Sequence, residues 1–111
     1  MAYSEGKMIV PLDFNGGPQI NAAVAAVQQE LSPWVRHIRY DIALDWSGQW
    51  GLFFRVLLSD EASSPINLRE IAPRVAWSLS QKLDLAAVGL FPYFDFRSES
   101  EQAKSNQPAW A

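Results

Sequence analysis

The chain has 111 residues, of which 49% are hydrophobic and 19% are charged, so we expect one folded domain with a single core and not a disordered segment. It contains no cysteine, which excludes disulfide bonds, thiolate catalysis and sulfur-based zinc sites, and which suits a reducing compartment. The formal net charge is −3, the basic residues form no stripe that would favour nucleic acid, and no apolar run approaches the ~18 residues of a membrane span. These properties predict a cytoplasmic protein that binds neither nucleic acid nor a membrane.

The first predicted elements are a short apolar run and a helix. The run, Met8–Leu12, contains a proline, so any strand there belongs at a sheet edge. After a glycine-rich turn, Pro18 suits the first turn of a helix, because its missing N–H is not needed there. Apolar residues then follow at helical spacing, namely Ile20, Val24, Val27 and Leu31. Ser32-Pro33 ends this helix, since proline disfavours the helical conformation of the residue before it.

The clearest pattern lies between His37 and Asp60, where two alternating runs are joined by a turn flanked by tryptophans. One side of the first run is apolar and consists of Ile38, Tyr40, Ile42, Leu44 and Trp46. Alternation of this kind predicts a strand with one buried face. Leu52–Leu58 continues as a second strand, antiparallel to the first. The alternation places Trp46 in the core and leaves Trp50, after the turn, as a candidate aromatic anchor for a partner.

A second helix and a third strand follow. Asn67 with Glu70 three residues later resembles a capping box at the start of this helix. Its inward stripe consists of Leu68, Ile71, Val75, Leu79 and Leu83. Pro73 lies within the stripe and predicts a kink or a break into two short helices. Leu90–Arg97 predicts the third strand, and Pro92 indicates that one side of it is unpaired.

The C-terminal residues are polar and show little pattern. We therefore expect a single α+β domain over residues 1–98 and a polar C-terminal tail over residues 99–111. Two alternatives remain open for the tail. It is either mobile, or Pro108-Ala109-Trp110 docks into a groove on this chain or on a neighbour.

The order of elements predicts the fold class. Helix, strand, strand, helix, strand gives an αββαβ two-layer sandwich, with a mixed three-stranded sheet and both helices on one face. The third strand would run parallel to the second and lie beside the first, so that His37–Trp46 is central. If Met8–Leu12 is also a strand, the order becomes the ferredoxin-like βαββαβ arrangement and His37–Trp46 moves to an edge. The proline in Met8–Leu12 favours the shorter version.

The face of the sheet opposite the helices carries the candidate interface. Its residues would be Arg39, Asp41 and Ala43 from the first strand, Phe53, Arg55 and Leu57 from the second, and Phe91, Tyr93, Asp95 and Arg97 from the third. A face that mixes aromatic side chains with opposed charges suits a two-fold interface between identical chains. We therefore expect a homodimer through this face or through a free strand edge, with a second protein as a further partner.

The sequence offers little for catalysis, metal binding or a cofactor, and we expect none of them. His37 is the only histidine, and Asp41 on the same strand face is too far along the strand for a direct hydrogen bond. The remaining acids lie at strand ends and in loops without a calcium-binding pattern. A small hydrolase that uses His37 or an acidic pair, or a nucleic-acid-binding sheet that uses the aromatic residues, is the third interpretation.

The order of elements resembles the cytoplasmic C-terminal domain of cation diffusion facilitators, a small αββαβ dimerising module. This resemblance implies dimerisation. It does not imply a metal site, because the metal-binding positions do not transfer to a chain with one histidine. A helix split at Pro73 would also resemble a type II KH domain, but no Gly-x-x-Gly loop with basic flanks is present, so RNA binding is not implied.

Four segments are similar to a group of short uncharacterised bacterial proteins, and the resemblance covers roughly residues 36–98. The segments are Asp45-Trp46-Ser47-Gly48, Phe54-Arg55-Val56, Leu58-Ser59-Asp60-Glu61 and Leu90-Phe91-Pro92-Tyr93-Phe94. Members of this group can be encoded beside small HEPN-type proteins, many of which are RNases in toxin–antitoxin pairs. The leading expectation is thus a non-enzymatic dimerising interaction module. The alternative is an antitoxin-like partner of a small HEPN- or RNase-type protein.

Overall fold

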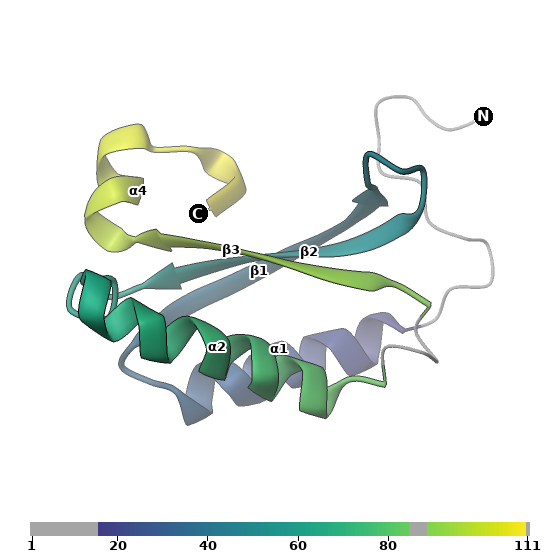
Figure 1. Cartoon of the computed structure of the whole chain (residues 1–111), viewed down its shortest axis with the longest axis horizontal. Coiled ribbons are helices and arrows are strands. Elements are labelled where there is room, and N and C mark those ends of the chain that lie inside the picture. The colour runs from purple at the N-terminus through teal and green to yellow at the C-terminus, as the bar shows by residue number, and fades with distance from the viewer. Residues whose placement is uncertain (1–15, 85–88, 111) are drawn as a thin grey trace.

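The computed structural model describes residues 16–84 and 89–110 (Figure 1). Its elements are α1 (Gly17–Glu30), β1 (Val35–Leu44), β2 (Trp50–Leu58), α2 (Pro65–Lys82), β3 (Phe91–Ser98), α4 (Glu99–Ser105) and the 3₁₀ turn η1 (Pro108–Trp110). The predicted α+β class with αββαβ order is confirmed. Met8–Leu12 lies outside the described residues. No helix in the described part of the chain is long and apolar enough to cross a membrane.

The three strands form one sheet in the order β1-β2-β3, with β1 antiparallel and β3 parallel to β2. The predicted order was wrong, because β3 lies beside β2 and not beside β1. The central strand is the most apolar one, and its inward residues Leu52, Phe54, Val56 and Leu58 are at most 1% exposed. β1 carries charged residues along its outward side, which is typical of an edge strand. Through α2, the chain returns directly to the free edge of β2.

The helix α2 begins earlier than the sequence suggested and runs without interruption. Ser64 is its N-cap and accepts a hydrogen bond from the backbone N–H of Asn67 at 3.4 Å, so the predicted capping role of Asn67 was wrong. The predicted break at Pro73 is also wrong, since one helix spans 18 residues. Pro73 is exposed, while Ile71 and Val75 on either side are buried against the sheet. Packing of both halves on the same core keeps the helix continuous.

The core lies between the sheet and the layer formed by α1 and α2. Ile20 and Val27 of α1, and Val75 and Leu79 of α2, are fully buried in it. Phe54 is 1% exposed and stacks on Phe94 of the neighbouring strand, with ring centroids 5.3 Å apart. Burial of an aliphatic or aromatic side chain of this size contributes about 1.5–3 kcal/mol.

β1 ends at Leu44, two residues before the alternation suggested, and the β1–β2 turn follows. The Asp45 carboxylate accepts hydrogen bonds from the backbone N–H groups of Ser47 at 2.9 Å and Gln49 at 3.0 Å, and Gly48 adopts a positive φ of 86°. This turn takes the chain out of the strand conformation after Leu44. The prediction that Trp46 lies in the core was therefore wrong, and its side chain is 85% exposed.

The last segment of the chain folds back over the sheet. Of the two alternatives for this segment, the structure shows the docked one, because Trp110 is 5% exposed. α4 has a complete capping box between Ser98 and Glu101, and Asn106 ends it in the left-handed conformation. Figure 1 shows α4 and η1 on the face of the sheet opposite α1 and α2. That face is therefore covered at one end and not wholly bare as predicted.

Candidate functional site: the open face of the sheet

The open face is the side of the sheet away from α1 and α2. The strand register aligns its residues in four rows, namely Ala43–Gly51–Phe91, Asp41–Phe53–Tyr93, Arg39–Arg55–Asp95 and His37–Leu57–Arg97. All of the predicted interface residues except Trp50 lie in these rows. Trp50 is half-buried and packs against the core. Strand alternation thus placed the outward residues correctly, whereas the aromatic anchor expected at Trp50 points inward.

Four aromatic side chains at one end of the open face form what we call the aromatic cluster: Trp46, Phe53, Phe91 and Tyr93. The Tyr93 ring is at its centre. Phe53 stacks on it with centroids 4.8 Å apart and planes 12° apart, while Phe91 at 5.1 Å and Trp46 at 5.5 Å meet it at steeper angles. Phe91 is 60% exposed and Trp46 85% exposed. The cluster is therefore ordered by mutual packing and still accessible from outside.

Gly51 provides the space in which the stacked rings lie. A Cβ atom at this position would stand 2.9 Å from Cε2 of Phe53 and 3.0 Å from Cε2 of Tyr93. These distances are well inside normal van der Waals contact. Since Gly51 and Phe53 are alternate residues on β2, the missing side chain lets both rings lean over the backbone.

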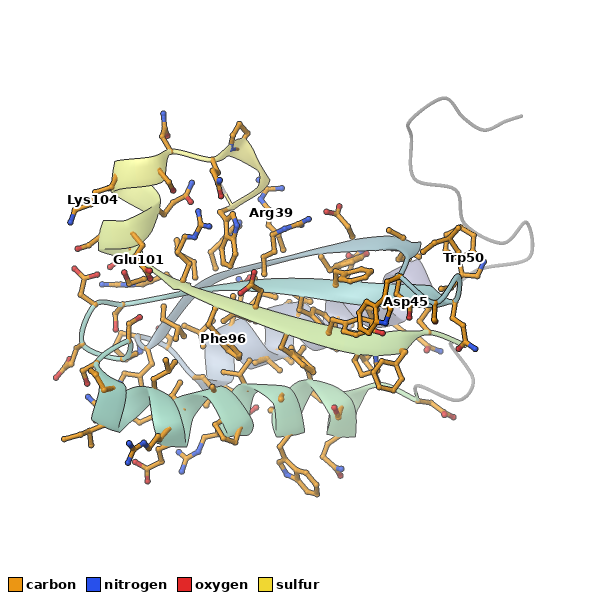
Figure 2. The ribbon with its side chains drawn as sticks, turned by 45° about the horizontal axis from the view of Figure 1, so that its top comes forward. Arg39, Asp45, Trp50, Phe96, Glu101 and Lys104 are labelled. Atoms are coloured by element: carbon orange, nitrogen blue, oxygen red, sulfur yellow. The ribbon has the colours of Figure 1, made fainter. Side chains whose placement is uncertain are left out.

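Asp45 holds the aromatic cluster from the turn side (Figure 2). Its carboxylate accepts hydrogen bonds from the hydroxyls of Ser47 at 2.6 Å and Tyr93 at 2.7 Å, besides the two backbone N–H groups of the turn. These hydrogen bonds, that of the Ser47 hydroxyl first, lower the pKa of Asp45 from 3.8 to about 2. Because the Tyr93 hydroxyl donates to this carboxylate, its pKa is raised above 10.0. Both groups keep their ordinary charge state at neutral pH.

Beside the aromatic cluster the open face is hollowed into a concavity of about 530 Å³. Residues of all three strands line it, namely Asp41, Ala43, Phe53, Phe54, Arg55, Tyr93, Phe94 and Asp95. Arg55 Nη1 lies 2.5 Å from Asp41 Oδ2, which forms a cross-strand ion pair diagonal to the register. Asp95 Oδ1 accepts a hydrogen bond from the backbone N–H of Phe96 at 3.0 Å. The floor of the concavity is thus aromatic, and charged side chains of both signs lie at its sides.

The C-terminal segment, residues 99–110, bounds the other end of the open face. Arg97 of β3 lies over the Trp110 ring, with its Cζ 4.5 Å from the ring centroid, and η1 packs on β2. The Nη1 of Arg97 also donates to Gln102 Oε1 at 3.2 Å and to Ser105 Oγ at 2.9 Å. Figure 2 shows this segment standing over the sheet, with Arg39 beneath it. The Arg97 guanidinium is therefore held by the chain's own C-terminal segment.

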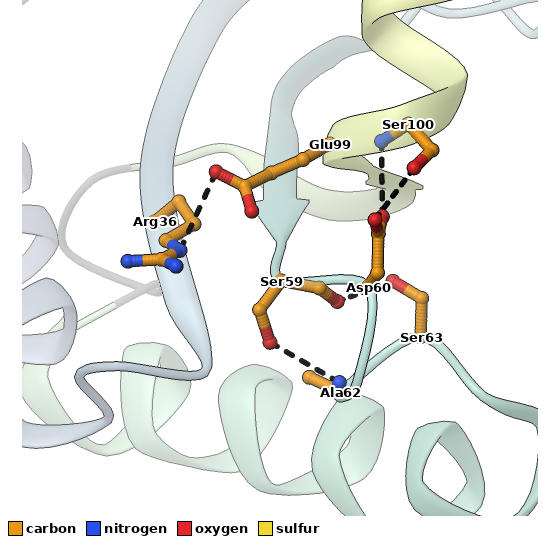
Figure 3. A network of polar contacts seen from close by, with 7 residues as sticks. All are labelled: Arg36, Ser59, Asp60, Ala62, Ser63, Glu99 and Ser100. Atoms are coloured by element: carbon orange, nitrogen blue, oxygen red, sulfur yellow. Dashed lines mark hydrogen bonds and ion pairs between the residues drawn. The ribbon is translucent and has the colours of Figure 1, made fainter.

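Polar contacts attach the start of the C-terminal segment to the beginning of β1 and to the residues that follow β2 (Figure 3). The Asp60 carboxylate accepts hydrogen bonds from the backbone N–H and the hydroxyl of Ser100, at 3.0 and 2.5 Å. These bonds, chiefly that of the hydroxyl, lower the pKa of Asp60. Arg36 Nε lies 3.4 Å from Glu99 Oε2, and both side chains are about half exposed.

The residues weighed for catalysis are not brought together. His37 is half-buried, and its Nε2 is buried without a hydrogen-bond partner among residues 16–84 and 89–110. In the same part of the chain, no three His, Cys, Asp or Glu side chains are grouped so as to hold a metal ion. Sequence reasoning missed Trp46 and Gly51 as parts of the site, whereas the docking of Trp110 was one of the two alternatives left open. For Trp46 a signal existed, since Asp-x-Ser-Gly is a turn sequence that interrupts the strand pattern.

Comparison with models of protein families, with curated proteins and with solved structures found no match to this chain. The residues and geometry of the open face are therefore the basis for the proposed function.

Proposed function

We propose that this protein is a non-enzymatic interaction module that associates with a second copy of itself through the open face. The aromatic cluster is the observation that carries the proposal. Trp46 and Phe91 keep large exposed surfaces although both are packed against Tyr93. Exposed apolar patches on a folded chain commonly mark contact sites, and aromatic side chains that are already ordered lose little entropy when they are covered.

The charges on the open face support a second copy as the occupant. Three arginines and three aspartates lie on it or at its turn end, namely Arg39, Arg55, Arg97, Asp41, Asp45 and Asp95. Two such faces related by a two-fold axis can place opposite charges against each other around an apolar centre. A strongly acidic or basic partner would instead meet like charges on this face. The concavity beside the aromatic cluster offers space for side chains of the partner.

Sedimentation velocity or gel filtration with light scattering tests the proposal directly. We expect reversible dimerisation of the full chain at micromolar concentrations. Phe91→Asp should weaken it by about tenfold or more, because it introduces a charge into the exposed aromatic cluster on which the contact depends. Ile66→Asp is the matched control, since Ile66 is an exposed apolar residue on α2, on the other face of the molecule. A monomer at all these concentrations would refute the proposal.

A second exposed apolar strip favours an additional role as partner of a different protein. Ile66, Pro73 and Trp77 lie on the same side of α2, because they are seven and four residues apart along the helix. The side chains of Ile66 and Trp77 are 80% and 65% exposed. This strip faces away from the open face, so a dimer would leave it free. We propose an antitoxin-like partnership with a small HEPN- or RNase-type protein as this second candidate. Affinity purification from the native host should then recover such a protein with the Phe91→Asp variant and lose it with Trp77→Asp.

A further inference from the structure

The C-terminal segment occupies part of the surface on which the proposed dimer depends. η1 packs on β2, and the Trp110 ring contacts the Arg97 guanidinium. Arg97 is the β3 residue that pairs with Leu57 of β2. The Trp110 ring and η1 therefore cover this end from within the same chain. The aromatic cluster at the opposite end is not covered.

Few apolar contacts attach the C-terminal segment to the sheet. α4 has no buried residue, and Trp110 is the buried apolar side chain of the segment as far as the structure describes it. The other contacts are polar and mostly exposed, such as those of Ser100 with Asp60 and of Glu99 with Arg36. Exposed ion pairs and hydrogen bonds of this kind contribute little against water. The Trp110 ring is thus the main apolar contact that keeps the segment closed.

The size of the sheet makes the covered end important for association. Three strands about 4.8 Å apart, of some eight residues at about 3.3 Å each, give a footprint on the order of 400 Å². A standard interface takes about 800 Å² of accessible surface from each partner. Even with its side chains, the open face reaches this range only if most of its length is available. When the segment is closed, the remaining contact area is therefore as small as that of weak interfaces.

We propose that residues 99–110 are an intramolecular cover that competes with a second copy of the chain for the end of the open face around Arg97. This inference rests on the self-association proposed above. When Trp110 leaves its site, the Arg97 guanidinium and the part of β2 on which η1 packs join the aromatic cluster in one continuous interface. A covered face that opens only part of the time raises the apparent dissociation constant by at least the inverse of its open fraction.

The Trp110→Ala variant of the full chain tests the cover. For a cover that is closed about nine-tenths of the time, the dimer dissociation constant should fall by about tenfold or more. Trp77→Ala is the matched control, because it removes an exposed tryptophan from α2 and should leave the dissociation constant unchanged. Thermal unfolding of each variant checks that the fold is retained. A dissociation constant that stays the same or rises in Trp110→Ala would overturn the inference while the dimer itself stands.

A reversible lock gives a second, independent measurement. The chain has no cysteine, and the side chains of Asp60 and Ser100 face each other across a hydrogen bond, so Asp60→Cys and Ser100→Cys are introduced together to lock the segment closed by a disulfide, whose formation is checked by mass spectrometry. The oxidised variant should dimerise more weakly than the same protein after reduction. Equal association in both states would contradict the cover. Monomers under every condition would refute the proposed function as well, which separates the two failures.

Discussion

Replacement of Gly51 by alanine tests whether the aromatic cluster depends on the bare backbone beneath it. The added Cβ would meet ring atoms of Phe53 at 2.9 and 3.2 Å and of Tyr93 at 3.0 Å. Carbon atoms normally approach to about 3.5–4.0 Å, so the rings must move by roughly half an ångström or more. The Phe53 ring is stacked on Tyr93, which also contacts Trp46 and Phe91, and the whole cluster must therefore adjust.

The expected size of the effect follows from opposing contributions. Off-rotamer rings cost about 0.5–1.5 kcal/mol, and disturbed aromatic pairs lose about 0.5–1.5 kcal/mol. Alanine in place of glycine in a strand returns about 0.5–1 kcal/mol, since it restricts the unfolded chain. The net change should be a loss of about 1 kcal/mol in the free energy of unfolding. For a chain of this length, the melting temperature should fall by about 4–6 °C.

Urea unfolding and near-UV circular dichroism measure the two consequences of Gly51→Ala, lower stability and altered packing of the aromatic rings. Gly17→Ala is the matched control, because nothing lies within 4 Å of a Cβ at that position in α1. It should leave the spectrum unchanged and not lower the stability. If Gly51→Ala kept both the wild-type stability and the wild-type near-UV spectrum, the packing described for the aromatic cluster would be incorrect.

Two further predictions concern ionisable side chains of the open face. The pKa of Asp45 is about 2 in the folded chain against 3.8 ordinarily, so its contribution to stability is present above about pH 4 and disappears as the pH falls from 4 to 2. Asp45→Asn should make the melting temperature less dependent on pH over this interval. The same pH dependence in the variant and the wild type would argue against the hydrogen bonds from Ser47 and Tyr93. His37→Leu should raise the free energy of unfolding by about 1 kcal/mol, because it removes the buried Nε2 that lacks a hydrogen-bond partner. His37→Gln, which retains a polar group, should not, and equal stability of the two variants in urea would contradict this reasoning.

Local patterns in the sequence predicted the elements and their faces well. Alternation along β1, β2 and β3 identified which side chains point outward, because a strand has a fixed period of two. The order of the strands was not predicted correctly, since it depends on where the chain returns after α2. One signal was available in β2, where Phe53 and Leu57 make the outward face apolar as well. A strand that is apolar on both faces is typical of the centre of a sheet.

The parts of the site that escaped prediction depend on single side chains and not on periodic patterns. The Asp45 carboxylate ends β1 early and turns Trp46 outward, which alternation alone cannot show. The docking of Trp110 was one of the two alternatives that the polar C-terminal sequence left open, because it depends on a capping box, on the left-handed Asn106 and on Arg97 acting together. Each of these is a common feature by itself, and only their arrangement in space directs the ring onto the sheet.

The connection through α2 has a consequence for the order in which the sheet assembles. Leu44 and Trp50 pair across a short turn, whereas Gly51 and Phe91 pair across 40 residues of sequence. By the logarithmic dependence of loop closure on length, the longer closure is less favourable by roughly 1.7 kcal/mol, so the hairpin should form first. Until β3 arrives, the most apolar strand of the molecule has an unpaired edge. That interval is when nascent chains are most prone to pair with one another, and rapid folding of α2 shortens it.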